Sequence, residues 1–171
     1  SFSKAVQLGH GLEASGKLSR TSMNRTISAM RICQQKLERH GVEHMRLVAT
    51  EACRRARNGH SFVSQVRKET GLNLEIIQPE EEARLAVVSC APLVSTKTEQ
   101  LLVVDIGGGS TELVWVDLTN VPPRERPRSI MRLHAGFKSD PGPFAAAKVV
   151  DWISVPLGVA TLRDHFADVE D

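Results

Sequence analysis

The sequence lacks three features that would each point to a particular class of protein. None of its apolar runs reaches the roughly 18 residues that a membrane-spanning helix needs, and no secretory signal pattern opens the chain. Its three cysteines, Cys33, Cys53 and Cys90, are widely spaced without a Cys-x-x-Cys pair, so neither a disulfide framework nor a zinc site is indicated. We therefore expect reduced thiols, a cytoplasmic location and no membrane partner.

The charge of the chain also lacks a strong bias. Its 171 residues carry a formal net charge of +2, which gives no electrostatic reason to expect a nucleic-acid partner. Basic residues gather locally at 54–60 and 124–129, and we interpret the second cluster as a solvated surface. The length suffices for one sizeable domain or two small lobes. The chain begins at Ser1 without a methionine, and we expect that the N-terminal part of a longer protein is absent from it.

Hydrophobic spacing predicts helices that alternate with strands. After Ser19, apolar residues recur at helical steps until Gly41, which suits the end of a helix. Further helices are expected at 51–59, from an N-cap at Ser61 to Gly71, from Pro79 onward and at 159–171. Strands are expected at 45–50, 73–78, 101–106, 111–117 and 147–158, the first and third of these buried. This alternation indicates an α/β fold.

The remaining segments read as connections. Residues 91–100 resemble a linker, and 118–129 and 134–144 resemble surface loops or poorly ordered insertions. The strands at 101–106 and 111–117 are separated by too few residues for a crossover helix, so we expect an antiparallel hairpin.

The turn of that hairpin holds the strongest chemical signal. Gly107, Gly108 and Gly109 leave the backbone bare, so that several N–H groups can bind one phosphate. Asp105 ends the preceding apolar strand and Glu112 lies on the departing one. A carboxylate beside a bound phosphate suggests a divalent cation between the two negative groups. The spacing matches neither a P-loop nor a dinucleotide-binding motif, and a turn that binds nothing would need only two glycines.

Two further groups of residues carry possible chemistry. Glu80, Glu81 and Glu82 follow Pro79, and acids at a helix start usually complement the helix dipole. Glu82 is also placed to act as a general base for water. Arg54 and Arg57 are one helical step apart after a strand, where they would either bind phosphate or pair with glutamates.

These motifs, in this order, resemble the exopolyphosphatase and guanosine pentaphosphate phosphohydrolase (Ppx/GppA) family of the sugar kinase, Hsp70 and actin superfamily. The resemblance rests on "LSRTSMNRTISAM", on "RLVATEACRRARNGHSFVSQVRKETGLNLEIIQPEEEARL", on "LLVVDIGGGSTELVW" and on "SVPLGVATL". It implies an actin-like ATPase fold with two ribonuclease H-like lobes, mixed sheets and flanking helices. We expect residues 1–90 to finish the first lobe and 91–171 to begin the second, in an incomplete part of a two-lobe protein.

The resemblance also implies roles for individual residues. Glu82 would be the catalytic base, Glu112 a second catalytic or metal-linked carboxylate, and Asp105 the group that serves Mg²⁺. Phosphate would be bound by a larger set: Arg54, Gly107, Gly108, Gly109, Ser110 and Thr111. The substrate would be inorganic polyphosphate or guanosine pentaphosphate, and the intact protein would form a homodimer.

The sequence departs from the family pattern in several places. The family's Asp-x-Gly-Ser phosphate motif is expected to lie before Ser1 and its later Ser-Gly-Thr loop beyond Asp171. Pro79 stands where many members have glycine. Two rival functions stay open. A sugar or acyl kinase of the superfamily would need an adenosine pocket that these residues do not show. A phosphate-sensing or nucleotide-sensing module would need the glycine turn and the arginines, but no base at Glu82.

Overall fold

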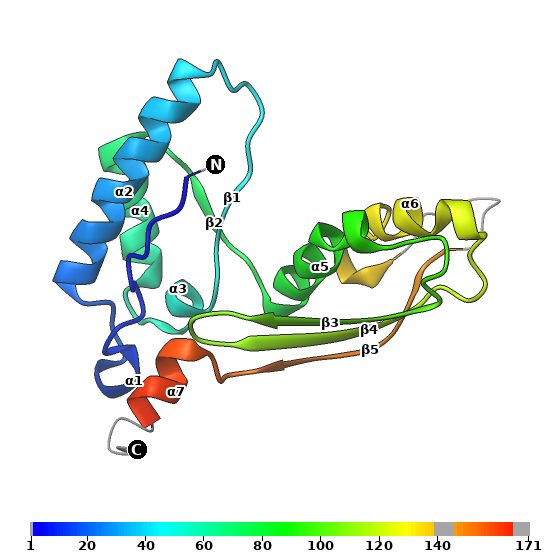
Figure 1. Ribbon diagram of the computed structural model, residues 1–171. Coiled ribbons are helices and arrows are strands. Elements are labelled where there is room, and N and C mark those ends of the chain that lie inside the picture. Colours follow the sequence, from blue (N-terminus) through cyan, green and yellow to red (C-terminus); the bar gives the residue numbers. More distant parts are fainter. Residues whose placement is uncertain (1, 139–145, 166–171) are drawn as a thin grey trace. The chain divides into compact units, whose positions relative to one another are not determined.

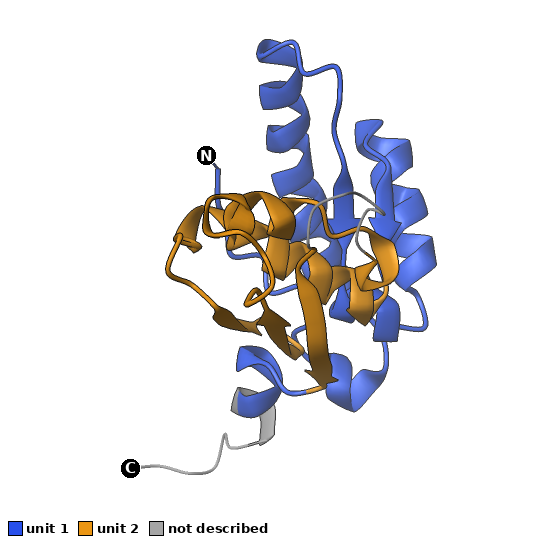
Figure 2. Ribbon diagram, turned by 90° about the vertical axis from the view of Figure 1, so that its right-hand side faces the viewer, with its two compact units in different colours: residues 1–77, 157–171 blue, residues 78–156 orange. Residues whose placement is uncertain are grey.

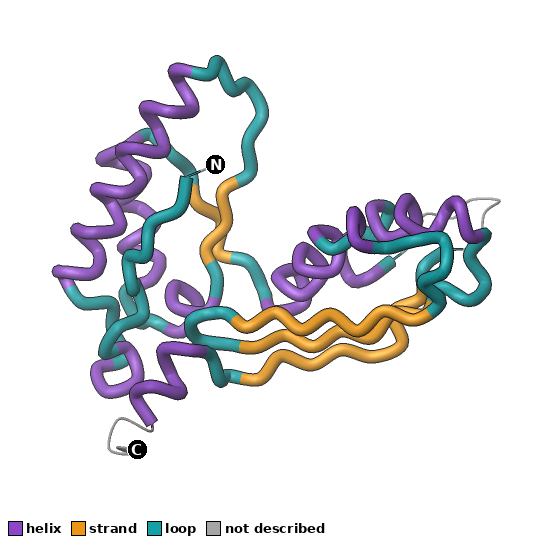
Figure 3. The backbone as a smooth tube through the Cα atoms, in the orientation of Figure 1, coloured by secondary structure: helices purple, strands orange, loops and turns teal. Residues whose placement is uncertain are grey.

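The chain folds as alternating helices and strands that form two compact units. The computed structural model describes residues 2–138 and 146–165. The first unit comprises residues 1–77 and 157–171, and the second comprises residues 78–156 (Figure 2). The expected α/β fold is confirmed (Figure 3). The expected lobe boundary after Cys90 lies inside the second unit, and that lobe boundary stays a prediction.

The first unit is built from helices and a small parallel sheet. Strands β1 and β2 pair in parallel, with Leu47 opposite Leu74 and Ala49 opposite Ile76. Helices α2 and α4 pack against each other, and α4 also contacts β2 (Figure 1). The elements are α1 (Leu12–Ser15), α2 (Arg20–Arg39), β1 (Leu47–Ala49), α3 (Glu51–Arg55), α4 (Gly59–Thr70), β2 (Leu74–Ile76) and α7 (Val159–His165).

Local capping explains where α2 begins and ends. The Ser19 side chain accepts a hydrogen bond from the Ser22 backbone N–H at the start of the helix, which satisfies a donor that the helix itself cannot pair. Gly41 follows the helix with a left-handed backbone (φ 59°), a conformation that glycine adopts without strain. The predicted helix and both of its end signals are confirmed.

The strand expected at 45–50 is shorter and less buried than its sequence indicated. Only Leu47–Ala49 is strand, and both Met45 and Val48 are exposed. The buried-strand prediction is therefore wrong here. A sheet of two strands with helices packed on one side leaves alternate side chains open to solvent.

Asn58 and Gly59 begin a helix where the sequence suggested that one closes. Helix α4 starts at Gly59, ahead of the predicted N-cap at Ser61. The Asn58 side chain pairs with the backbone of Leu18, accepting from its N–H at 2.8 Å and donating to its carbonyl at 3.0 Å. This contact spans forty residues of chain, so local spacing does not reveal it.

The three cysteines are free, as expected. Cys53 lies in the core of the first unit, and burial raises the pKa of its thiol to about 11. This thiol therefore stays protonated near neutral pH and is a poor nucleophile.

The second unit is a three-stranded antiparallel sheet with helix α5 on one face. The strand order is β3–β4–β5, so the predicted hairpin is confirmed. Ala83 and Val87 of α5 pack with Val103 and Val114 of the sheet in one buried cluster. The elements are α5 (Pro79–Ser89), η1 (Ala91–Leu93), β3 (Gln100–Ile106), β4 (Thr111–Asp117), η2 (Pro123–Glu125), α6 (Arg126–Met131), η3 (Ala135–Phe137) and β5 (Lys148–Val155).

The opposite face of this sheet is apolar but open. Leu102, Val104 and Ile106 of β3 are all more than half exposed, and Trp115 of β4 lies opposite Leu102. The expectation that 101–106 is a buried strand is therefore wrong, because β3 is an edge strand of a sheet covered on one face only. Its apolar run fits a strand whose two faces both carry apolar residues.

Segments interpreted as connections contribute to the core. Ala91 and Val94 of the expected linker and Val121 of the expected surface loop are buried in the same cluster as α5, together with Ile130, which directly follows that loop. Phe137 contacts the Trp152 ring, while the rest of the predicted loop at 139–144 lies outside the described residues. Short helical turns separated by prolines bury these apolar side chains without the regular spacing on which a sequence prediction depends.

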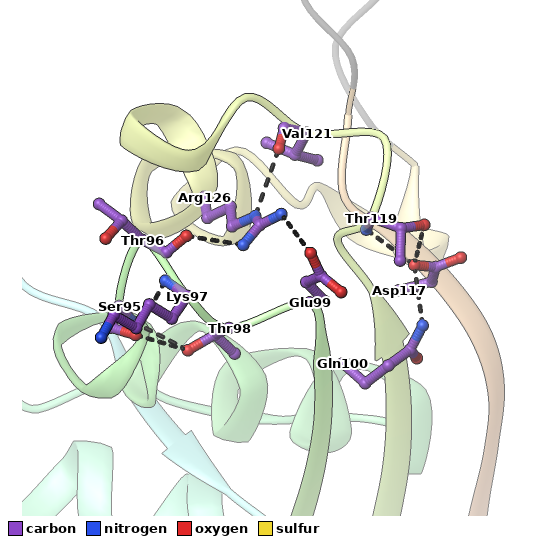
Figure 4. Close-up of polar contacts among 10 residues, drawn as sticks. All are labelled: Ser95, Thr96, Lys97, Thr98, Glu99, Gln100, Asp117, Thr119, Val121 and Arg126. Carbon is purple, nitrogen blue, oxygen red and sulfur yellow. Dashed lines mark hydrogen bonds and ion pairs between the residues drawn. The ribbon is translucent and has the colours of Figure 1, made fainter.

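Arg126 shows most clearly that the second basic cluster is not simply a solvated surface. Its side chain is buried, with 4% of the residue exposed. The guanidinium donates to the carbonyl oxygens of Thr96 (2.7 Å) and Val121 (3.3 Å), and Glu99 lies 3.5 Å away (Figure 4). The solvated interpretation is wrong for this residue, which joins three segments by hydrogen bonds.

The same close-up shows how the end of β4 is held. The Thr119 backbone N–H and hydroxyl both donate to Oδ1 of Asp117, at 2.9 and 2.7 Å (Figure 4). These two hydrogen bonds lower the pKa of the Asp117 carboxyl. The acidic residue therefore serves the turn after β4, at the end of the strand away from the glycines.

Candidate functional site

The glycine turn closes the β3–β4 hairpin. Ile106 and Thr111 are the last paired residues, and the Gly107 N–H donates to the Ser110 carbonyl at 2.9 Å. The loop that carries the glycines is therefore short and fixed at both ends by regular strand pairing.

The glycines of this loop leave backbone donors available. Among the residues that the structure describes, no acceptor is bound by the N–H groups of Gly108, Gly109 or Ser110. None of Gly107, Gly108 and Gly109 has a left-handed φ, so turn geometry does not require glycine at these positions. A Cβ placed on Gly108 would meet no atom within 4 Å. An unpaired N–H group with open space beside it, as at Gly108, suits an anion.

Asp105, Glu112 and Ser154 form one row across the sheet. Asp105 pairs with Glu112 between β3 and β4, and Glu112 pairs with Ser154 between β4 and β5. Side chains of directly opposite residues point to the same face, and residues two positions apart on a strand share a face. The row therefore lies on the α5-covered face, next to the buried Val103 and Val114.

Glu112 is an ionisable residue buried almost completely, with 1% of its surface exposed. Its Oε1 accepts a hydrogen bond from the Ser154 hydroxyl at 2.8 Å. Its Oε2 is buried and has no hydrogen-bond partner among the described residues. A buried carboxylate oxygen without a donor is costly, so this atom is prepared for a ligand that donates or carries positive charge.

Asp105 differs from Glu112 in its exposure. Although it shares the α5-covered face, it is exposed to solvent, because β3 is an edge strand and the row lies beside the glycine turn. No hydrogen bond or ion pair with a described residue occupies its carboxylate. Two carboxylates on directly opposite residues repel each other unless a cation or a proton lies between them.

These two carboxylates suit a hard divalent cation. Oxygen ligands are those that Mg²⁺ prefers, and it is usually held by one or two carboxylates with water and substrate phosphates. No cluster of three or more metal-binding side chains occurs within residues 2–138 and 146–165. The protein would therefore supply Asp105 and the free oxygen of Glu112, and the other ligands would come from water and phosphate.

Glu82 lies in the first turn of α5, the helix that packs on the same sheet. Its carboxylate is half-buried, and the neighbouring Ala83 is fully buried against the strands. Helix α5 begins near the hairpin end of β3 and β4 and runs toward their other end (Figure 1). The structure thus places Glu82, Asp105, Glu112 and the glycine turn in one unit.

Arg54 lies in the first unit, on α3. One guanidinium nitrogen donates to the Ile77 carbonyl at 2.6 Å, and another pairs with Glu51 at 2.7 Å. Pairing with a glutamate is the alternative that the sequence left open beside phosphate binding. The phosphate role of Arg54 stays a prediction.

Ser154 is the site residue that sequence reasoning missed. Its stretch, "SVPLGVATL", contributed to the family resemblance, but nothing in the spacing connects residue 154 with residue 112. A serine within an apolar strand is a weak signal that becomes informative only once the β4–β5 register is known.

No helix in the described part of the chain is both long and apolar enough to cross a membrane.

A family model described as the Ppx/GppA phosphatase family matches residues 2–169, which is nearly the whole sequence.

Solved structures of similar proteins match the same extent of the chain. A crystal structure of the Aquifex aeolicus member of the Ppx/GppA protein family is 32% identical, with a TM-score of 0.63. An exopolyphosphatase from Cytophaga hutchinsonii is 24% identical, with a TM-score of 0.76, and this likeness concerns the fold alone. The matches cover 95% and 98% of this chain but 44% and 45% of those proteins. The chain thus has part of the fold of these proteins and spans less than half of their length.

Proposed function

The chain belongs to the Ppx/GppA phosphatase family, and from this premise we propose that the full-length protein hydrolyses terminal phosphoanhydride bonds. The substrate is inorganic polyphosphate, shortened from one end, or guanosine pentaphosphate, which loses its 5′-terminal phosphate. The observation that carries the proposal is one hairpin that joins three backbone N–H groups to two facing carboxylates. Among the described residues, these N–H groups bind no acceptor, and one buried oxygen of Glu112 has no partner.

The chain's own residues suggest how the phosphate is held. The N–H groups of Gly108, Gly109 and Ser110 donate to oxygens of the terminal phosphate, where a short loop fixed by strand pairing keeps them in place. Donors that are already oriented stabilise charge without reorganising during the reaction. Asp105 and Glu112 would hold Mg²⁺, which would neutralise negative charge on the phosphates. Arg54 is proposed as a further phosphate contact from the family resemblance alone.

Glu82 is the proposed base. Its carboxylate accepts a proton from the attacking water as the water oxygen bonds to phosphorus and the phosphoanhydride bond breaks. The products are orthophosphate and the shortened substrate. Positioning and electrostatic stabilisation supply most of the rate in phosphoryl transfer, so the base is expected to contribute about 10²- to 10⁴-fold.

The deciding experiment measures phosphate release by the full-length protein with Mg²⁺ from long-chain polyphosphate and from guanosine pentaphosphate. Glu82→Gln should lower the rate by at least about 100-fold. Glu80→Gln is the matched control, because Glu80 lies in the same first turn of α5. It should retain the wild-type rate within about twofold, as expected for a partner of the helix dipole.

The outcomes separate the rival functions. An unchanged rate in Glu82→Gln would contradict the assignment of the base. Tight phosphate binding by a wild-type protein that hydrolyses neither substrate would favour the sensing module. Phosphate transfer from ATP to a sugar or an acyl group would favour the kinase.

A further inference from the structure

The hydrogen bond between Ser154 and Glu112 joins a central strand to an edge strand at the candidate site. Ser154 lies on β5, and its hydroxyl donates to Oε1 of Glu112 at 2.8 Å. The other carboxylate oxygen, Oε2, has no partner among the described residues although it is buried. The two oxygens of the Glu112 carboxylate thus differ, because only Oε1 accepts a hydrogen bond from a described residue.

We propose that Ser154 is a positioning residue that fixes the Glu112 carboxylate, so that Oε2 is presented to a hydrated divalent cation shared with Asp105. The identity of the ligand rests on the proposed function above. The asymmetry of the Glu112 carboxylate does not, because it follows from the contacts of Glu112 itself.

The sheet does not need this polar pair for its own stability. The neighbouring row on the same face consists of Val103, Val114 and Trp152, and apolar side chains there pack against the α5 cluster. A buried carboxylate in the next row loses hydration that one hydrogen bond replaces only in part. The buried Glu112–Ser154 pair lowers the free energy of unfolding relative to an apolar pair. Its presence is better explained by a role in ligand binding.

One anchored oxygen has a specific consequence for ligand binding. Without Ser154, the terminal carboxylate torsion is free to rotate, because such torsions have broad preferences. With Ser154 in place, its hydroxyl on the edge strand β5 holds Oε1 of Glu112, and Oε2 faces the ligand. Groups that orient metal-binding side chains in this way typically change metal affinity or activity by 10- to 100-fold when removed.

The test compares substitutions in the full-length protein. Ser154→Ala removes the donor, whereas Ser154→Thr keeps a hydroxyl and suits a strand. The matched control is Ser89→Ala, because the Ser89 hydroxyl donates at 2.7 Å to the Ala86 carbonyl in the same unit, without contact to Glu112. We expect Ser154→Ala to lower kcat by at least about 10-fold with the substrate KM nearly unchanged, while Ser154→Thr and Ser89→Ala stay near wild type.

A double-mutant cycle distinguishes positioning from a structural contribution. In a Glu112→Ala background there is no carboxylate to orient, so adding Ser154→Ala should not lower kcat further. A further loss of about 10-fold or more would overturn the proposal, because Ser154 would then act without Glu112. Glu112→Met offers a second background of similar volume without an oxygen for Ser154 to bind, if the alanine variant fails to fold.

A binding measurement keeps the proposal testable without turnover. Mn²⁺ titration followed by electron paramagnetic resonance, with inorganic phosphate present, should show at least about 10-fold weaker binding in Ser154→Ala. Ser89→Ala should bind as the wild type does. Equal affinity in Ser154→Ala, or no Mn²⁺ binding by the wild type, would overturn the positioning role. Mn²⁺ binding without phosphate release would overturn only the proposed hydrolysis.

Discussion

Asp105 on β3 and Glu112 on β4 are directly opposite residues of one hairpin, and both place a carboxylate on the face that α5 covers. Facing carboxylates are an unfavourable pair in a sheet. Their hairpin also carries the N–H groups of Gly108, Gly109 and Ser110, which bind no acceptor among the described residues. The same few residues therefore combine attraction for anions at the turn with attraction for cations one row away.

Removing one of the two facing charges should stabilise the protein while weakening its function. Asp105→Asn is expected to raise the free energy of unfolding by about 0.2–1 kcal/mol without divalent cations, the size of a cross-strand charge effect. Urea denaturation followed by circular dichroism measures this change. The same variant should bind Mn²⁺ more weakly.

Asp151→Asn is the matched control for that prediction. Asp151 lies on the same sheet, but its cross-strand partner is Trp115 rather than an acid. Neutralising it should give no comparable stabilisation. A loss of stability in Asp105→Asn would show that no repulsion is relieved and would contradict the proposed cation site.

Gly108 provides a test of the phosphate-binding loop that does not rely on the carboxylates. An added Cβ meets nothing within 4 Å, and the φ angle is not left-handed, so Gly108→Ala should leave the unfolding free energy unchanged or raise it by up to about 1 kcal/mol. The new methyl group occupies the space beside the unpaired N–H groups. Inorganic phosphate should therefore bind at least several-fold more weakly, as measured by calorimetry.

Gly107→Ala is expected to lower the free energy of unfolding, in contrast to Gly108→Ala. Its Cβ would lie 3.2 Å from the Ser110 carbonyl oxygen, which closes the loop, so the fold should lose stability. Unchanged phosphate binding in Gly108→Ala would exclude this loop as the phosphate site.

The sequence predicted the parts of the fold that depend on nearby residues. The helix Arg20–Arg39 follows from its spacing and its Ser19 cap, and the hairpin follows from a loop too short for a crossover. The glycine loop and both carboxylates of the site lie within eight residues of chain, so their proximity was also visible. Each of these features is decided locally.

Contacts between distant segments were not visible in the sequence. Asn58 binds the Leu18 backbone forty residues away, and Ser154 binds Glu112 forty-two residues away. Arg126 occupies a buried position within a run of charged residues and prolines. A local pattern cannot distinguish such an arginine from a solvated one, because its acceptors are carbonyl groups of other segments.

Gly59 is predicted to be the glycine on which the first unit most depends. A Cβ at Gly59 would lie 1.9 Å from the Cys53 carbonyl oxygen, a backbone atom that cannot move without distorting α3. Gly59→Ala should therefore reduce the unfolding free energy by about 3 kcal/mol or more, among the larger single-residue effects. Gly9→Ala serves as the control, since its Cβ would make an ordinary 3.5 Å contact with Ala52. Similar unfolding midpoints for the two variants would contradict the close approach.

Arg126 should matter for stability and not for chemistry. Arg126→Ala removes the donor that satisfies the Thr96 and Val121 carbonyl groups and leaves a cavity where a buried side chain was, so the unfolding free energy should fall by about 2 kcal/mol or more. Helix α6 lies at the end of the sheet away from the glycine turn (Figure 1). Phosphate release per folded molecule should therefore stay near the wild-type value.

Arg128→Ala is the matched control for Arg126, because Arg128 is on the same helix but its side chain is 70% exposed, 3.9 Å from Glu125. An exposed ion pair contributes little, so the unfolding free energy should change by no more than about 0.5 kcal/mol. Because carbonyl contacts of a buried guanidinium are screened less than surface pairs, the difference between the two variants should persist in about 0.5 M salt. Equal stability losses in the two variants would mean that Arg126 is bound no more firmly than a surface arginine, and a loss confined to low salt would assign its role to Glu99 instead of the two carbonyl groups.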